Sequence, residues 1–131
     1  IMKILIAEDD LAFTEFIKKS IEKFGECITV DNGAASITAF MNAVNNNDFF
    51  DLIIHDIEIP RINGLDAIAI IRQIEKVIHP QKKEKTKIIV ISGHSDKDNV
   101  IGCFKAGCDK YIVKPFDIVK LFAILESLGI K

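Results

Sequence analysis

The chain has 131 residues, 49% of them hydrophobic, which suits one domain with a single well-buried core. Its 17 basic and 19 acidic residues give a net charge of −2, which argues against nucleic-acid binding, since that needs a basic excess. No apolar stretch reaches the roughly 20 residues of a membrane span, and we expect no signal peptide. The three cysteines lack metal-site spacing and suggest reduced thiols, so we expect a cytoplasmic protein.

Short apolar runs alternate along the chain with apolar residues at helical spacing. Residues 3–7 (KILIA) predict a buried strand, and the apolar positions of 13–24 predict a helix that Gly25 ends. The segment 27–30 (CITV) predicts the next strand, and 37–44 the next helix. In chain order there follow a strand at 51–55, a helix at 67–78 closed by Pro80, a strand at 87–92, a helix at 100–104 ended by Gly107, a strand at 111–113 and a helix at 118–128.

This order of strand then helix, repeated along the whole chain, predicts an α/β fold. Parallel strands joined by right-handed crossovers place helices on both faces of one sheet, which gives three layers. The polar segment 79–87 is interpreted as a solvated loop. We find no linker, repeat or second core.

Polar residues follow four of the predicted strands, at the edge where ligands bind in open α/β sheets. They are Glu8-Asp9-Asp10, Asp56, Ser92-Gly93 and Lys114-Pro115. Asp31-Asn32-Gly33 after the second strand is interpreted as a turn and helix cap, and Asp10 also fits an N-cap.

Acids at the ends of neighbouring strands repel one another and raise each other's pKa unless a cation lies between them. Hard oxygen ligands at few positions suit Mg²⁺. A lysine and a hydroxyl beside the metal complete the parts of a phosphoryl-transfer site. Asp56, at the end of the buried run LIIHD, can itself take the phosphoryl group as an aspartyl-phosphate.

The motifs ILIAEDD, HDIEIPRINGLD, VISGHSD and AGCDKYIVKPF, in this order, resemble those of the receiver domain of two-component response regulators. The resemblance implies a flavodoxin-like sheet of five strands in the order 2-1-3-4-5 with five helices, resembling the chemotaxis regulators. It implies one receiver domain over residues 2–131, with no second domain. It also implies Mg²⁺ as cofactor.

The resemblance further implies a role for each motif residue. Asp56 would be the phospho-acceptor. The Mg²⁺ ligands would come from Glu8, Asp9, Asp56 and the backbone carbonyl of Glu58, with Asp9 a direct ligand. Lys114, before a cis Pro115, would pair with the phosphoryl oxygens. Ser92 would be the switch hydroxyl, and Tyr111 the aromatic residue whose rotamer follows it.

The chain departs from the common receiver pattern at Glu8, where aspartate is usual, and at Gly93, where alanine is common. Glu58 and His94 occupy positions that tune phosphoryl lifetime in relatives, and we hypothesise that they contact the attacking water. The alternative is that both are solvated loop side chains. His55 points away from Asp56 on a strand, so we expect it to be packed and hydrogen-bonded rather than catalytic.

The implied function is a signalling switch rather than an enzyme acting on a metabolite. A histidine kinase or histidine phosphotransfer protein would supply the phosphoryl group. A downstream protein or a fused output domain would read the switch, with no direct nucleic-acid or membrane binding by this domain.

Three other functions fit parts of the pattern. An aspartate-nucleophile phosphatase needs a second aspartate where Glu58 stands, with further acids downstream. An FMN-binding flavodoxin would place a phosphate where Glu8-Asp9-Asp10 would repel it. A phosphorylation-independent docking module is disfavoured because Asp56 and Lys114 are intact.

Overall fold

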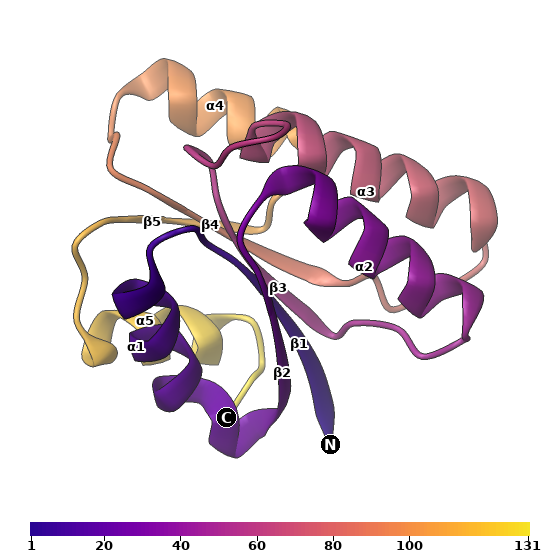
Figure 1. The fold of residues 1–131 in the computed structure, drawn as a ribbon, viewed down its shortest axis with the longest axis horizontal. Helices are drawn as coiled ribbons and strands as arrows, with labels where there is room; N and C mark the ends of the chain where they lie inside the picture. The colour runs from indigo at the N-terminus through magenta and orange to yellow at the C-terminus, as the bar shows by residue number, and fades with distance from the viewer.

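The computed structural model describes residues 1–131 and alternates five strands with five α-helices (Figure 1). The strands are β1 (Met2–Ala7), β2 (Gly25–Val30), β3 (Leu52–Asp56), β4 (Lys87–Ser92) and β5 (Lys110–Val113). The helices are α1 (Leu11–Ile21), α2 (Gly33–Asn45), α3 (Gly64–Ile78), α4 (Lys97–Ala106) and α5 (Ile118–Ser127). The predicted elements are confirmed in type and order. None of the helices is both long and apolar enough to cross a membrane.

The first helix ends earlier than predicted. A short 3-10 helix, Glu22–Phe24, follows α1, and Gly25 opens β2 instead of capping the helix. A Cβ atom on Gly25 would lie 2.0 Å from the Met2 carbonyl oxygen of β1, so only glycine allows this approach of the two backbones. The glycine therefore serves the pairing of β1 with β2.

The sheet is parallel in the order β2-β1-β3-β4-β5, as the receiver resemblance implied. Helices α1 and α5 cover one face, and α2, α3 and α4 cover the other (Figure 1). This order makes β1 and β4 the two neighbours of β3. The residues that follow β1 and β4 therefore flank Asp56 at the carboxyl edge of the sheet.

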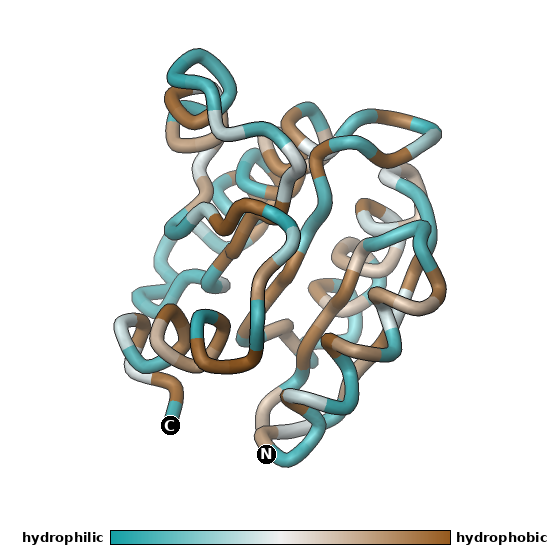
Figure 2. Tube along the Cα trace, turned by 90° about the vertical axis from the view of Figure 1, so that its left-hand side faces the viewer, coloured by the Kyte–Doolittle hydropathy of each residue, from teal (hydrophilic) through white to brown (hydrophobic).

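Two apolar clusters hold the layers together, one on each face of the sheet. Along β3, Ile53 packs toward α2 and α3, whereas Leu52 and Ile54 pack toward α1 and α5. Figure 2 shows the strands as hydrophobic segments inside a more polar outline. Every residue of β3 is buried, and each buried apolar side chain contributes about 1.5–3 kcal/mol. The strand that carries Asp56 is thus firmly fixed.

Side-chain caps fix the helices that begin at the carboxyl edge. Asp10 accepts a hydrogen bond from the Phe13 N–H, as predicted, and Asn32 accepts one from the Ala35 N–H. Asn63, Asp96 and Asp117 cap α3, α4 and α5 in the same way. Each cap stabilises its helix by about 1 kcal/mol.

A polar network at Arg72 joins α3 to the connection between α4 and β5. The guanidinium donates hydrogen bonds to the Gly107 carbonyl at 2.9 Å, to Glu75 at 2.9 Å and to Asp109 at 3.1 Å. The Glu75 side chain is only 6% exposed, and Arg72 is the cation paired with its carboxylate. Glu75 in turn accepts from the Thr86 N–H just before β4.

We predict that Arg72→Ala lowers the free energy of unfolding by about 3 kcal/mol, because it leaves Glu75 charged and buried without its cation. Urea unfolding followed by circular dichroism measures this. Lys76→Ala, on the exposed side of the same helix, is the control and should change stability by less than about 0.5 kcal/mol. Equal stability of the two variants would contradict a supporting role for the network.

Candidate functional site

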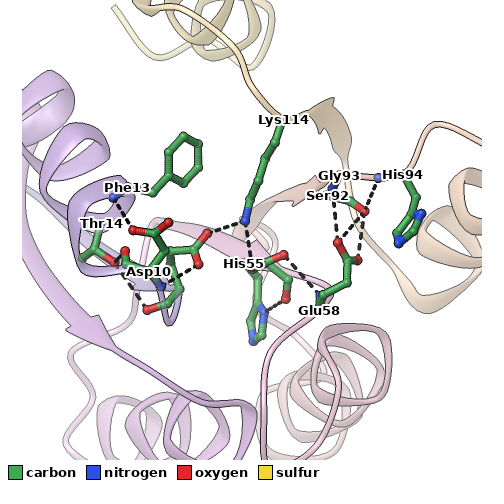
Figure 3. A network of polar contacts seen from close by, with 11 residues as sticks. Asp10, Phe13, Thr14, His55, Glu58, Ser92, Gly93, His94 and Lys114 are labelled. Carbon is green, nitrogen blue, oxygen red and sulfur yellow. Dashed lines mark hydrogen bonds and ion pairs between the residues drawn. The ribbon is translucent and has the colours of Figure 1, made fainter.

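Charged and polar side chains gather at the carboxyl edge of the sheet, among them Lys114, Glu58 and Ser92 (Figure 3). Asp56, the last residue of β3, joins this cluster through Lys114 and the Glu58 N–H. Its side chain is 2% exposed. Lys114, after β5, reaches across the edge, with its Nζ 2.9 Å from Asp56 Oδ2 and 2.7 Å from Glu8 Oε1. The prediction that residues following different strands meet at this edge is confirmed.

The three acids differ in how their oxygens are used. Glu8 Oε2 accepts a hydrogen bond from the Asp10 N–H at 3.0 Å, whereas Oε1 is buried, pairs electrostatically with Lys114 and lacks a well-aligned hydrogen bond. Asp9 is exposed. Carboxylate oxygens of Glu8, Asp9 and Asp56 all lie within 4.8 Å of one another. This oxygen-only set, with one oxygen lacking a hydrogen bond, fits a small hard divalent cation.

Burial raises the pKa of the Asp56 carboxyl from 3.8 to about 6, against the lowering effect of the Lys114 hydrogen bond. The negative charges of Glu8 and Glu58 raise this pKa further. Burial by itself lowers the pKa of Lys114, but its close contacts with the carboxylates of Glu8 and Asp56 outweigh burial and raise it. The lysine is therefore firmly cationic, whereas burial and the nearby negative charges make Asp56 harder to ionise.

Glu58 makes the contacts on the β4 side of the site. Its backbone N–H donates to Asp56 Oδ1 at 3.2 Å. Its carboxylate accepts hydrogen bonds from Ser92 Oγ at 2.9 Å and from the Gly93 N–H at 3.1 Å (Figure 3). Glu58 is exposed to solvent, and its carboxylate is also bonded to the end of β4.

Ser92 and Tyr111 are linked through the backbone of His94. The Ser92 hydroxyl accepts from the His94 N–H at 3.0 Å, and the Tyr111 hydroxyl donates to the His94 carbonyl. Tyr111 also packs against the cluster on the α2–α4 face. The predicted pair of switch residues is thus physically connected, and His94 contributes backbone groups to the connection.

His55 lies on the opposite side of β3 from Asp56 and is fully buried, as predicted. Its Nδ1 lies 2.8 Å from the Asp56 carbonyl oxygen, and its Nε2 lies 2.8 Å from Ser36 Oγ of α2. Because a carbonyl only accepts, Nδ1 carries a proton. Burial lowers the pKa of His55 to about 4, so the ring is neutral near pH 7. Sequence reasoning missed Ser36, which a small polar residue on the inward face of the second helix could have signalled.

The loop between Asp56 and α3 is anchored to the start of α2. The Gly33 N–H donates to the Pro60 carbonyl at 3.0 Å, and the Ala34 N–H donates to the Arg61 carbonyl at 2.7 Å. A Cβ atom on Gly64 would lie 2.2 Å from the Asp56 carbonyl oxygen, so the glycine of the Asn63-Gly64 pair permits close packing against the Asp56 backbone. The Lys114–Pro115 peptide bond is cis, as expected.

A family model described as "Response regulator receiver domain" matches residues 4–126. The response regulator ArlR of Staphylococcus saprophyticus is 35% identical over 126 residues, which are 96% of this chain and 51% of that protein. The chain therefore spans about half the length of the curated relatives it matches.

Solved structures share the fold. The receiver domain of the histidine kinase CKI1 from Arabidopsis thaliana, complexed with Mg²⁺ and BeF₃⁻, superposes with a TM-score of 0.80 at 22% identity, covering 96% of this chain and 90% of that one. The CheX–CheY–BeF₃–Mg²⁺ complex from Borrelia burgdorferi gives a TM-score of 0.82 at 23% identity, covering 99% and 90%. At these identities the likeness establishes the architecture.

We predict that Asp56 titrates near pH 6 in metal-free protein and that Glu8→Gln lowers this midpoint. The substitution removes a neighbouring negative charge and leaves Lys114 to Asp56 alone. Because the folded-state pKa is raised, ionising Asp56 disfavours the folded state, so its contribution to stability falls as the pH rises from 3.8 toward 6. Carboxyl ¹³C NMR measures the midpoint.

Asp10→Asn is the matched control for this titration, since it removes an exposed acid and retains an N-cap residue. The Asp56 midpoint should stay near its wild-type value in this variant. An unchanged midpoint in Glu8→Gln would show that the charge of Glu8 does not act on Asp56.

Proposed function

This chain belongs to the response regulator receiver domain family, and from that premise we propose that Asp56 is its phospho-acceptor. The observation that carries the proposal is the environment of the Asp56 carboxylate. It is buried at the end of β3, 2.9 Å from the Lys114 ammonium and beside two further acids. Glu8 shares both the pairing with Lys114 and the possible metal set, but Asp56 is the acid that ends the fully buried strand β3.

The reaction would proceed by direct displacement. A carboxylate oxygen of Asp56 forms a bond to phosphorus while the bond from phosphorus to the donor's leaving group breaks, and the leaving group keeps the electron pair. Lys114 would hold a phosphoryl oxygen by charge, and the Ser92 hydroxyl would donate to another. The buried strand would keep Asp56 aligned with the incoming donor.

Glu8, Asp9, Asp56 and the Glu58 carbonyl would hold Mg²⁺. When bound, the ion would offset the negative charge that the acids and the phosphoryl group bring together. Asp9 would be a direct ligand, because it is exposed, whereas both oxygens of Glu8 already face Asp10 or Lys114. The role of Glu58 and His94 in phosphoryl lifetime stays a prediction.

The phosphoryl donor would be a histidine kinase or a histidine phosphotransfer protein, and the reader a downstream protein or a fused output domain. The curated relatives are about twice as long as this chain, which is compatible with a fused output domain. We propose a single receiver domain over residues 2–131. It would catalyse its own phosphorylation and dephosphorylation without turnover of an external metabolite.

We predict that incubation with Mg²⁺ and acetyl phosphate adds one phosphoryl group, seen by intact mass as an acid-stable, base-labile adduct. Asp56→Asn should prevent the gain, because an amide is not a nucleophile here, and EDTA should also prevent it. A gain in Asp56→Asn would overturn the assignment of the acceptor. No gain in the wild-type protein together with no Mg²⁺ binding would favour the phosphorylation-independent docking module.

We predict that Asp9→Asn weakens Mg²⁺ binding by at least about tenfold, the scale seen for losses around a metal site. Calorimetric titration of Mg²⁺ measures the affinity. Asp10→Asn is the matched control, since it removes the adjacent charge while its side chain only caps α1. Equal weakening in both variants would indicate a general charge effect instead of direct ligation by Asp9.

A further inference from the structure

Two hydrogen-bond donors at the end of β4, the Ser92 hydroxyl and the Gly93 N–H, already bind the carboxylate of Glu58. The Ser92 hydroxyl lies 3.2 and 2.9 Å from the two carboxylate oxygens of Glu58, and the Gly93 N–H lies 3.1 Å from one of them. Ser92 is fully buried, whereas Glu58 is exposed to solvent. A buried hydroxyl is thus held by the end of an exposed side chain.

These donors lie close to the position where charge would appear on phosphorylation, because Asp56 pairs across the sheet with Ile91, the residue before Ser92. Glu58 follows Asp56 by two residues, and its N–H is bonded to Asp56 Oδ1. The Glu58 carboxylate is close enough to raise the pKa of Asp56 by repulsion. A phosphoryl group on Asp56 would add close to two negative charges here and would compete for the same donors.

The Glu58 contacts continue to the aromatic switch residue. Glu58 orients the Ser92 hydroxyl, which accepts from the His94 N–H, and the His94 carbonyl accepts from Tyr111. An anion held at Ser92 and Gly93 therefore also orders the loop after β4 and the Tyr111 ring.

We propose that the Glu58 carboxylate is an internal stand-in for the phosphoryl group, holding Ser92, the following loop and Tyr111 in place before phosphorylation. The proposal rests on Asp56 being the acceptor. On phosphorylation the new dianion displaces Glu58 from the two donors, and the exposed side chain moves into solvent. Glu58 is thus both an organiser of the unphosphorylated site and a competitor of the phosphoryl group.

The matched test variant is Glu58→Gln, which keeps the shape and removes the charge. Charge-assisted hydrogen bonds are roughly twice as strong as neutral ones, so loss of this competitor should tighten binding of BeF₃⁻ with Mg²⁺ by about fivefold. Glu126→Gln, an exposed site on α5, controls for the change in net charge. The affinity is measured by titrating BeF₃⁻ into each protein and following amide NMR signals.

A second readout needs no phosphoryl mimic. In metal-free protein, the Gly93 amide proton should shift upfield in Glu58→Gln, and the Tyr111 ring signals should show averaging between rotamers. Unchanged Gly93 and Tyr111 signals would overturn the organising role. Weaker BeF₃⁻ binding in Glu58→Gln than in the wild type would overturn the competing role.

The two readouts separate this proposal from the assignment of Asp56. If the wild-type protein bound no BeF₃⁻, both the acceptor role of Asp56 and the competition by Glu58 would be contradicted. The Gly93 and Tyr111 signals of metal-free protein would still decide whether Glu58 holds the loop. Asp56→Asn should bind no BeF₃⁻ yet keep the wild-type Gly93 signal, because the Glu58 contacts do not pass through the Asp56 carboxylate.

Discussion

The ion pairs of Lys114 with Glu8 and Asp56 are the interaction on which the site depends. Two carboxylates that are almost fully buried cannot both stay ionised side by side unless a cation lies between them. Lys114 supplies that cation from the far side of the sheet, after β5, while the acids come from β1 and β3. The pairing therefore also ties together strands that do not neighbour one another. Even so, burial keeps the pKa of Asp56 raised, so the lysine offsets only part of the crowding.

The structure divides into a rigid side and an adaptable side around Asp56. On the rigid side, His55 and Ser36 bond the Asp56 backbone to α2, and the loop that follows is anchored to Gly33 and Ala34. The two histidine bonds are buried and the loop bonds join backbone groups, so moving Asp56 would break several at once. On the adaptable side, the Glu58 carboxylate and the His94 backbone are exposed. An aspartate fixed on one side and an exposed carboxylate on the other suit a bistable switch.

Sequence patterns predicted most of the framework because the relevant signals are local. Strand runs, helical spacing and the caps at Asp10 and Asn32 lie within a few residues of what they determine. The convergence of Asp56 and Lys114 followed from the parallel alternation alone. The wrong assignment of Gly25 arose because a glycine after a helix signals a C-cap as readily as a close strand contact.

The contacts that sequence reasoning did not predict join side chains far apart in the chain. Ser36 and His55 are 19 residues apart, Glu58 and Ser92 are 34 apart, and Arg72 and Asp109 are 37 apart. Each depends on how two helices or loops seat on the sheet, which no local pattern records. Glu58 illustrates the difficulty, because a glutamate in an exposed loop is usually solvated, and only the position of Ser92 shows that it is engaged.

The engagement of Glu58 limits how much free energy phosphorylation can supply to a conformational change. A ligand shifts an equilibrium only by its difference in affinity for the two states. Donors that bind no anion beforehand would give the phosphoryl group its full interaction with Ser92 and Gly93, whereas here the gain is the difference between phosphoryl and carboxylate. With Ser92 and Tyr111 ordered in advance, less of the response can come from their movement. More of it would then come from the displaced Glu58 side chain.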